Sequence, residues 1–120
     1  MAGKDIKFIP NQATILVVDD EPINIEILCA MLEQKGYKVD CSSSGLEALY
    51  LIKERFKLVQ QGKASMYKLI LLDFSIPDMD GPEIARQARI FFKENSTCVA
   101  DTLDPVICCC TAYTEATFMK

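Results

Sequence analysis

Short apolar runs alternate along the chain with longer amphipathic stretches. Residues 14–18, 69–72 and 106–110 form continuous apolar runs rich in branched side chains, which is typical of strands buried on both faces. Residues 37–41 instead alternate between apolar and polar, which predicts a strand nearer the edge of a sheet. Strands that alternate with helical stretches indicate an α/β fold built on a parallel sheet.

Each stretch between the predicted strands carries signals for the start or end of a helix. Pro22 suits a first helical turn, and Gly36 supplies a left-handed stop. Ser44 and Glu47 have the spacing of a capping box, and Asp80 can cap a third helix. Each predicted helix has an apolar stripe at helical spacing. In the first helix the stripe is Ile23, Ile27, Ala30 and Met31, widened by Leu28 and Leu32. In the second it is Leu46, Leu49, Ile52 and Phe56, which are expected to face inward, and in the third it is Ile84, Ala88 and Phe91 or Phe92, which are expected to face the sheet. Residues 114–115 resemble the start of a fourth helix.

Polar side chains follow three of the predicted strands at the point where each strand ends. Asp19 and Asp20 follow the first strand, Asp73 follows the third, and Thr111 follows the fourth. Each could be an ordinary turn or cap residue. Because parallel strands bring their carboxyl ends to one edge of a sheet, where α/β proteins bind ligands, the joint pattern predicts one pocket of three carboxylates and a hydroxyl.

This set of groups points to phosphoryl transfer. Neighbouring carboxylates repel one another, and a divalent cation with oxygen ligands, Mg²⁺ or Mn²⁺, removes that repulsion. An aspartate such as Asp73 can act as a nucleophile toward phosphorus, with a metal and a hydroxyl stabilising the phosphoryl oxygens. No glycine-rich nucleotide-binding loop of the Walker type occurs in the sequence.

Composition limits the other classes of function. The 120 residues suit a single domain, and the sequence contains no histidine, which excludes nucleophile pairs with histidine, histidine-ligated zinc and a phosphohistidine made on this chain. The net charge of −4 disfavours nucleic acid as a partner.

The location of the chain is expected to be cytoplasmic. No apolar run is long enough to cross a membrane, and residues 1–12, expected to form an arm outside the fold, lack the apolar core of a signal peptide. The six cysteines include no pair with metal-site spacing, and three of them are consecutive in an apolar run. They are therefore interpreted as small buried apolar residues of a reducing compartment rather than as a disulfide framework or a zinc site.

Three segments together resemble the receiver domain of two-component response regulators. They are Ile-Leu-Val-Val-Asp-Asp-Glu-Pro at 15–22, Leu-Leu-Asp-Phe-Ser-Ile-Pro-Asp-Met-Asp-Gly at 71–81, and Thr-Ala at 111–112. The resemblance covers about residues 13–120 and implies a flavodoxin-like (CheY-like), doubly wound parallel sheet with strand order 2-1-3-4-5. Asn24 after Pro22 is similar to receivers attached to hybrid histidine kinases.

The same resemblance implies a role for each site residue. Asp73 would accept the phosphoryl group in a Mg²⁺-dependent reaction, and Thr111 would be the switch hydroxyl. Asp20, Asp73 and the backbone carbonyl of Ser75 would ligate Mg²⁺ directly, whereas Asp19 would act mainly through water. The donor would be a phosphohistidine on a histidine kinase or a histidine phosphotransfer domain, so the chain would be a signalling module rather than an enzyme.

The chain also departs from the receiver pattern. Receivers have five strand–helix units, whereas this sequence supplies four strands and the start of a fourth helix, with no counterpart of the fifth strand, its aromatic residue or the lysine after it. The strand at 106–110 would then be an exposed edge, which predicts self-association. Two other functions remain open: an interaction module that is not phosphorylated, and a phosphatase with an aspartyl nucleophile.

Overall fold

The computed structural model describes residues 13–95 and 105–110, so the N-terminal arm, Thr111 and the start of a fourth helix lie outside the described residues. The elements are β1 (Ile15–Val18), α1 (Pro22–Gln34), β2 (Val39–Ser42), α2 (Gly45–Gln60), β3 (Leu69–Asp73), α3 (Gly81–Asn95) and β4 (Val106–Cys110). Every strand and helix predicted within these residues is present, with ends that differ by no more than a few positions.

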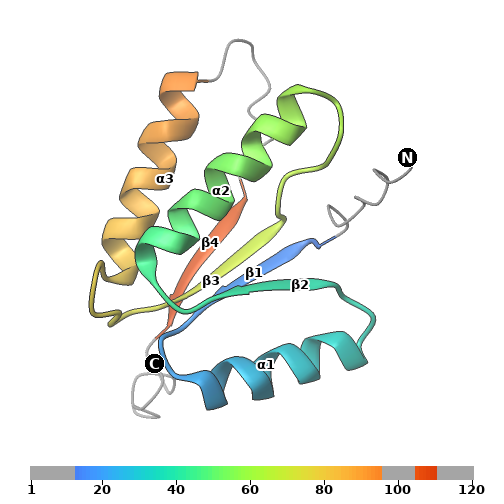
Figure 1. Ribbon diagram of the computed structural model, residues 1–120, viewed down its shortest axis with the longest axis vertical. Helices are drawn as coiled ribbons and strands as arrows, with labels where there is room; N and C mark the ends of the chain where they lie inside the picture. The colour runs from blue at the N-terminus through green and yellow to red at the C-terminus, as the bar shows by residue number, and fades with distance from the viewer. Residues whose placement is uncertain (1–12, 96–104, 111–120) are drawn as a thin grey trace, which may run out of the picture.

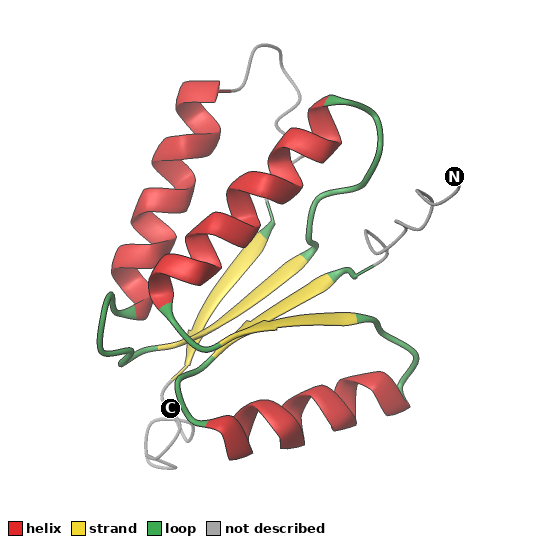
Figure 2. Ribbon diagram, in the orientation of Figure 1, coloured by secondary structure: helices red, strands yellow, loops and turns green. Residues whose placement is uncertain are grey.

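The four strands form one parallel sheet in the order β2-β1-β3-β4. Helix α1 covers one face of the sheet, whereas α2 and α3 lie side by side on the other (Figure 1). Figure 2 shows the resulting three layers, with the sheet between helices. The α/β, doubly wound parallel architecture is therefore confirmed, and β2 is at an edge as its alternating sequence predicts.

The main core lies between the sheet and the pair α2 and α3. Leu16, Ile70 and Leu72 of the strands are fully buried against the helices' apolar stripes. The predicted inward residues Leu49, Ile52, Phe56, Ile84, Ala88 and Phe92 are buried. Leu46 is not: its side chain is 62% exposed. The buried stripe of α2 starts at Gly45, and the next residue is turned by about 100° around the helix, so Leu46 points to its flank.

Much of the predicted apolar stripe of α1 faces solvent. Ile23, Ile27 and Met31 are 65%, 55% and 54% exposed, and no residue of α1 is fully buried. Leu28 and Leu32, which widen the predicted stripe, are half-buried. All of these positions satisfy helical periodicity, so only packing decides which side of the stripe is covered.

The interpretation of the cysteines as small buried residues is wrong for those that the structure describes. Cys41, Cys108 and Cys109 are exposed, and Cys29 and Cys110 are half-buried. Cys41 belongs to edge strand β2, and the other exposed pair belongs to edge strand β4. A continuous apolar run suits a strand covered on both faces, but a strand at the edge of the sheet keeps part of its surface accessible.

A buried arginine organises the end of the sheet where the strands begin. Arg55 of α2 is 5% exposed and donates hydrogen bonds to the backbone carbonyls of Ala13 (2.8 Å) and Ser65 (3.0 Å). It also pairs with Asp40 at 3.4 Å, and its guanidinium lies 4.1 Å from the ring centre of Tyr67. The Tyr67 hydroxyl donates to the same carboxylate at 2.6 Å. These contacts join α2, β2 and the loop before β3.

No helix in the described part of the chain combines the length and the apolar character needed to cross a membrane.

The capping predictions are largely confirmed. Ser44 accepts a hydrogen bond from the Glu47 amide at 3.0 Å, but Glu47 receives its own bond from the Ser42 hydroxyl rather than completing a capping box. Asp80 accepts from the Glu83 amide at 3.0 Å and so caps α3. Gly36 has a positive φ of 96°, as its place after α1 predicts.

Candidate metal and phosphoryl site

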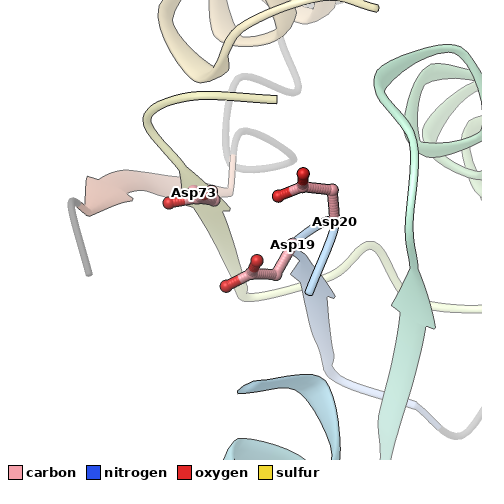
Figure 3. Close-up of side chains that lie close together, drawn as sticks. All are labelled: Asp19, Asp20 and Asp73. Carbon is pink, nitrogen blue, oxygen red and sulfur yellow. The ribbon is translucent and has the colours of Figure 1, made fainter. Parts of the chain in front are cut away.

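Three carboxylates meet at the edge of the sheet where β1 and β3 end. Oxygen atoms of Asp19, Asp20 and Asp73 all lie within 4.8 Å of one another, and each side chain is half-buried (Figure 3). Parallel pairing of β1 with β3 causes this meeting, because Val18 is in register with Leu72 and the following residues therefore emerge together. The convergence predicted from the sequence is thus confirmed for the three aspartates.

Hydrogen bonds from the start of α1 orient Asp19. Its Oδ1 accepts from the Glu21 backbone amide at 3.0 Å, and its Oδ2 accepts from the Asn24 side-chain amide at 3.3 Å. Both carboxylate oxygens are therefore already engaged, which leaves them less available to an ion. In the sequence Asn24 is only part of a motif. The structure shows that its side chain holds Asp19.

Gly81 allows the loop after β3 to fold back over Asp73. The Gly81 amide donates to the Phe74 carbonyl at 3.0 Å, and a Cβ added at Gly81 would lie only 2.6 Å from the Asp73 carbonyl oxygen. Any side chain at this position would push the end of β3 away. In the sequence this glycine is only part of the receiver-like segment 71–81, and the structure adds the reason for it, which is its close approach to the Asp73 backbone.

The same loop is attached to α2 through Asp78. Its two carboxylate oxygens accept hydrogen bonds from the Gly45 and Leu46 amides, at 2.9 and 3.0 Å. These amides belong to the first turn of α2, where backbone N–H groups lack helical partners, so Asp78 acts as a cap from a distant segment. The hydrogen bonds hold the pKa of Asp78 below its ordinary value. Sequence reasoning missed this contact because the partners are more than thirty residues apart.

The electrostatics of the cluster favour a cation. Partial burial raises the pKa of the Asp73 carboxyl, and the charges of Asp19 and Asp20 raise it further. Three carboxylate oxygens within a few ångströms, on a half-exposed edge that admits water, match the all-oxygen ligation that Mg²⁺ prefers. The residues present therefore fit this ion.

The two remaining predicted site residues are less defined. Ser75 lies two positions after Asp73 in the exposed first part of the loop. Thr111 lies outside the described residues, but it directly follows Cys110, which is in register with Asp73 across β3 and β4. Metal ligation by the Ser75 carbonyl and a switch role for Thr111 stay predictions.

Residues 15–115 match the model of the response regulator receiver domain family. The chain belongs to this family. It is a receiver domain of two-component phosphorelay signalling, and receiver domains of histidine kinases and response regulators are signalling modules. "Probable histidine kinase 1" of Oryza sativa subsp. indica is 36% identical to it over 95 residues, which are 79% of this chain and 9% of the kinase. The chain thus spans less than a tenth of that relative's length.

Solved receiver domains share the fold. The receiver domain of the histidine kinase CKI1 from Arabidopsis thaliana, complexed with Mg²⁺, aligns with a TM-score of 0.68 at 29% identity, over 81% of this chain and 66% of that one. The second is the co-crystal structure of the Saccharomyces cerevisiae histidine phosphotransfer protein Ypd1 and the receiver domain of the response regulator Ssk1. A chain of that structure aligns with a TM-score of 0.60 at 27% identity, over 88% of this chain and 68% of that one. The flavodoxin-like, CheY-like fold expected from the sequence is therefore confirmed.

Proposed function

We propose that this receiver domain accepts a phosphoryl group from a phosphohistidine onto Asp73 in a Mg²⁺-dependent reaction. The observation that carries the proposal is the cluster of Asp73 with Asp19 and Asp20 at the carboxyl edge of the sheet. A raised pKa makes the Asp73 carboxylate more basic than a free one, and a more basic carboxylate is a better nucleophile. The donor would be a histidine kinase or a histidine phosphotransfer domain, and the location would be cytoplasmic.

In the proposed reaction, an oxygen of Asp73 attacks phosphorus and forms an acyl phosphate. The phosphorus–nitrogen bond of the donor breaks, and its imidazole leaves and takes up a proton. Asp20, Asp73 and the Ser75 carbonyl would hold the ion, while Asp19, already bonded to Asn24, would act through water. Bound Mg²⁺ supplies positive charge that offsets the charge of the phosphoryl oxygens. Thr111 would donate its hydroxyl hydrogen to one of those oxygens after transfer.

Labelling by a small phosphodonor tests the phosphoacceptor. With acetyl phosphate and Mg²⁺, we expect one acyl phosphate per chain in the wild type and none in Asp73→Asn. Asp78→Asn is the matched control, because it changes the same residue type in the same loop, and it should still be labelled. Labelling of Asp73→Asn would refute the assignment. Mg²⁺ binding without labelling would favour an interaction module, and steady turnover of p-nitrophenyl phosphate would favour a phosphatase.

The donor domain is proposed to dock on the exposed apolar face of α1. Ile23, Ile27 and Met31 form this face, and α1 begins directly after the loop that holds Asp19 and Asp20. A donor histidine must come within bonding distance of Asp73, so its domain has to cover a surface beside the acidic cluster. Exposed apolar side chains are the usual core of such contacts. The complex of Ypd1 with a receiver domain supports a phosphotransfer domain as the occupant.

Transfer kinetics test this docking face. Ile27→Glu should slow phosphoryl transfer from a phosphorylated histidine phosphotransfer protein at least tenfold and leave labelling by acetyl phosphate unchanged. Ile90→Glu is the matched control, because Ile90 is also exposed but lies on α3, on the opposite side of the sheet. Equal transfer rates for the two variants would show that the donor docks elsewhere.

Self-association through β4 is a separate part of the proposal. Among the described residues β4 pairs only with β3, and Val106 at its start is 63% exposed. An apolar strand with one unpaired side can pair with a second copy, and a lysine on an edge strand prevents this. Light scattering under reducing conditions should therefore detect dimers of the wild type and monomers of Val106→Lys. A monomeric wild type at high micromolar concentration would contradict this idea.

A further inference from the structure

Two cysteines from different elements meet between α1 and the sheet. The Sγ atoms of Cys29 and Cys41 lie 2.7 Å apart, with Cys29 in the middle of α1 and Cys41 on β2. A disulfide bond is about 2.05 Å long, so the two sulfurs need to approach by only about 0.7 Å to bond. Neither residue belongs to the acidic cluster, and the proposed phosphoryl transfer gives them no task.

The sheet separates this pair from the other described cysteines. Cys108, Cys109 and Cys110 lie on β4, and the order β2-β1-β3-β4 puts two strands between β4 and β2. A sulfur on β4 therefore cannot compete with Cys41 for Cys29 within one folded chain. The pair is also reachable from outside, because Cys41 is exposed and Cys29 is half-buried. An oxidant dissolved in water can thus meet two thiols that are already in contact.

The protonation of the pair suits a stepwise exchange. Partial burial and the adjoining Cys29 sulfur raise the pKa of the Cys41 thiol to about 12. Cys41 therefore keeps its hydrogen at neutral pH. The thiolate is the form that attacks a disulfide, so the first attack is assigned to Cys29.

We propose that Cys29 and Cys41 are a modification site that closes to an intramolecular disulfide when the chain meets a low-molecular-weight disulfide such as oxidised glutathione. The Cys29 thiolate attacks one sulfur of the oxidant and releases one glutathione thiolate. Cys41 then loses its proton to water, its thiolate attacks the Cys29 sulfur, and the second glutathione leaves as a thiolate that takes up a proton. Two protein thiols are oxidised, and one glutathione disulfide is reduced to two glutathione molecules.

Closure would attach the least buried helix covalently to the sheet. No residue of α1 is fully buried, so noncovalent contacts hold α1 less firmly than α2 or α3. The bond would join residues twelve positions apart, a short loop whose closure restricts the unfolded chain. Because Asn24 in the first turn of α1 bonds Asp19, a fixed α1 would also restrict movement at the acidic cluster.

Mass spectrometry of the oxidised wild-type chain tests the proposal. After treatment with oxidised glutathione, peptide mapping should find the peptides that contain Cys29 and Cys41 joined, with two hydrogens lost and no glutathione attached. A variant with Cys98→Ser, Cys108→Ser, Cys109→Ser and Cys110→Ser should give the same bond. In the complementary variant with Cys29→Ser and Cys41→Ser, the peptides that contain positions 29 and 41 should stay unjoined. Stable glutathione adducts on both cysteines, or a joined peptide that pairs either one with another position, would overturn the proposal.

Hydrogen exchange tests the consequence for α1. In the variant that retains only Cys29 and Cys41, backbone amides of α1 should exchange about tenfold more slowly after oxidation, and dithiothreitol should restore the original rates. Amides of α3 serve as an internal control and should change little. Formation of the bond with unchanged exchange throughout α1 would refute covalent attachment as its effect. Circular dichroism of each variant establishes that the Ser substitutions leave the fold intact.

Discussion

The repulsion within the acidic cluster leads to a prediction that removing a charge stabilises the protein. Asp19, Asp20 and Asp73 place carboxylate oxygens within 4.8 Å of one another. Two unit charges at that distance repel by about 1 kcal/mol in water and by about 3.5 kcal/mol at an effective dielectric constant of 20. Water still reaches all three side chains and screens their charges, so the lower figure is the better guide. Asp20→Asn removes two of the three repulsive pairs and should raise the free energy of unfolding by about 1–2 kcal/mol.

Magnesium should reverse the order of stability. An ion that binds only the folded state, present at one hundred times its dissociation constant, stabilises that state by about 2.7 kcal/mol, which exceeds the 1–2 kcal/mol advantage of Asp20→Asn. The wild type should gain this amount, whereas Asp20→Asn, which lacks one proposed ligand, should gain little. Urea denaturation in the presence of a chelator and then of Mg²⁺ measures both effects. Glu94→Gln removes the same charge at the far end of α3 and should leave both quantities nearly unchanged.

Without metal, the pH dependence of the free energy of unfolding measures the same repulsion independently. Burial and the two neighbouring charges raise the pKa of Asp73 above its ordinary value of 3.8. A carboxyl whose pKa is higher in the folded state destabilises that state when ionised. The resulting loss of folding stability is complete at neutral pH, begins to disappear as the pH falls through the raised pKa, and is gone below 3.8.

The argument from charge repulsion would be refuted if Asp20→Asn were less stable than the wild type in chelator and gained as much stability from Mg²⁺.

Three further variants test the structure around the site. Arg55→Ala should lower the free energy of unfolding by about 1–3 kcal/mol in urea denaturation, because it leaves the carbonyl of buried Ala13 without its donor, while Mg²⁺ affinity of the remaining folded protein should not change. Gly81→Ala should cost about 1–3 kcal/mol and also weaken Mg²⁺ binding, measured by calorimetry, because its methyl group would displace the Asp73 backbone. Asp78→Ala should unfold at lower urea concentration than the wild type above pH 3.8, and this difference should shrink in stronger acid, because the lowered pKa of Asp78 stabilises the fold only while the carboxyl is ionised.

Local chemistry explains why much of the fold could be predicted. Continuous apolar runs marked β1, β3 and β4, and Pro22, Ser44 and Asp80 marked helix starts, because these signals depend on a few neighbouring residues. The same kind of reasoning did not show which side of the wide apolar stripe of α1 is covered. It failed for Leu46, which lies about 100° around the helix from buried Gly45 and is exposed.

For the candidate site, the sequence by itself determined the residue types and their order. Aspartates at the ends of two predicted parallel strands have to emerge at one edge, and the pairing of β1 with β3 then brings them together. Tertiary structure alone decided what surrounds them, which includes the Asn24 bond to Asp19, the close passage of Gly81 over Asp73, and the Asp78 cap on α2.

The cysteines show the same division. Their spacing gave no sign of a pair, and only the packing of α1 against β2 brings the sulfurs of Cys29 and Cys41 to 2.7 Å. Periodicity and capping act over one or two turns of chain, so a sequence reveals them directly. Contacts between distant segments depend on which face is covered and on the register of the strands, and those are properties of the assembled sheet and helices.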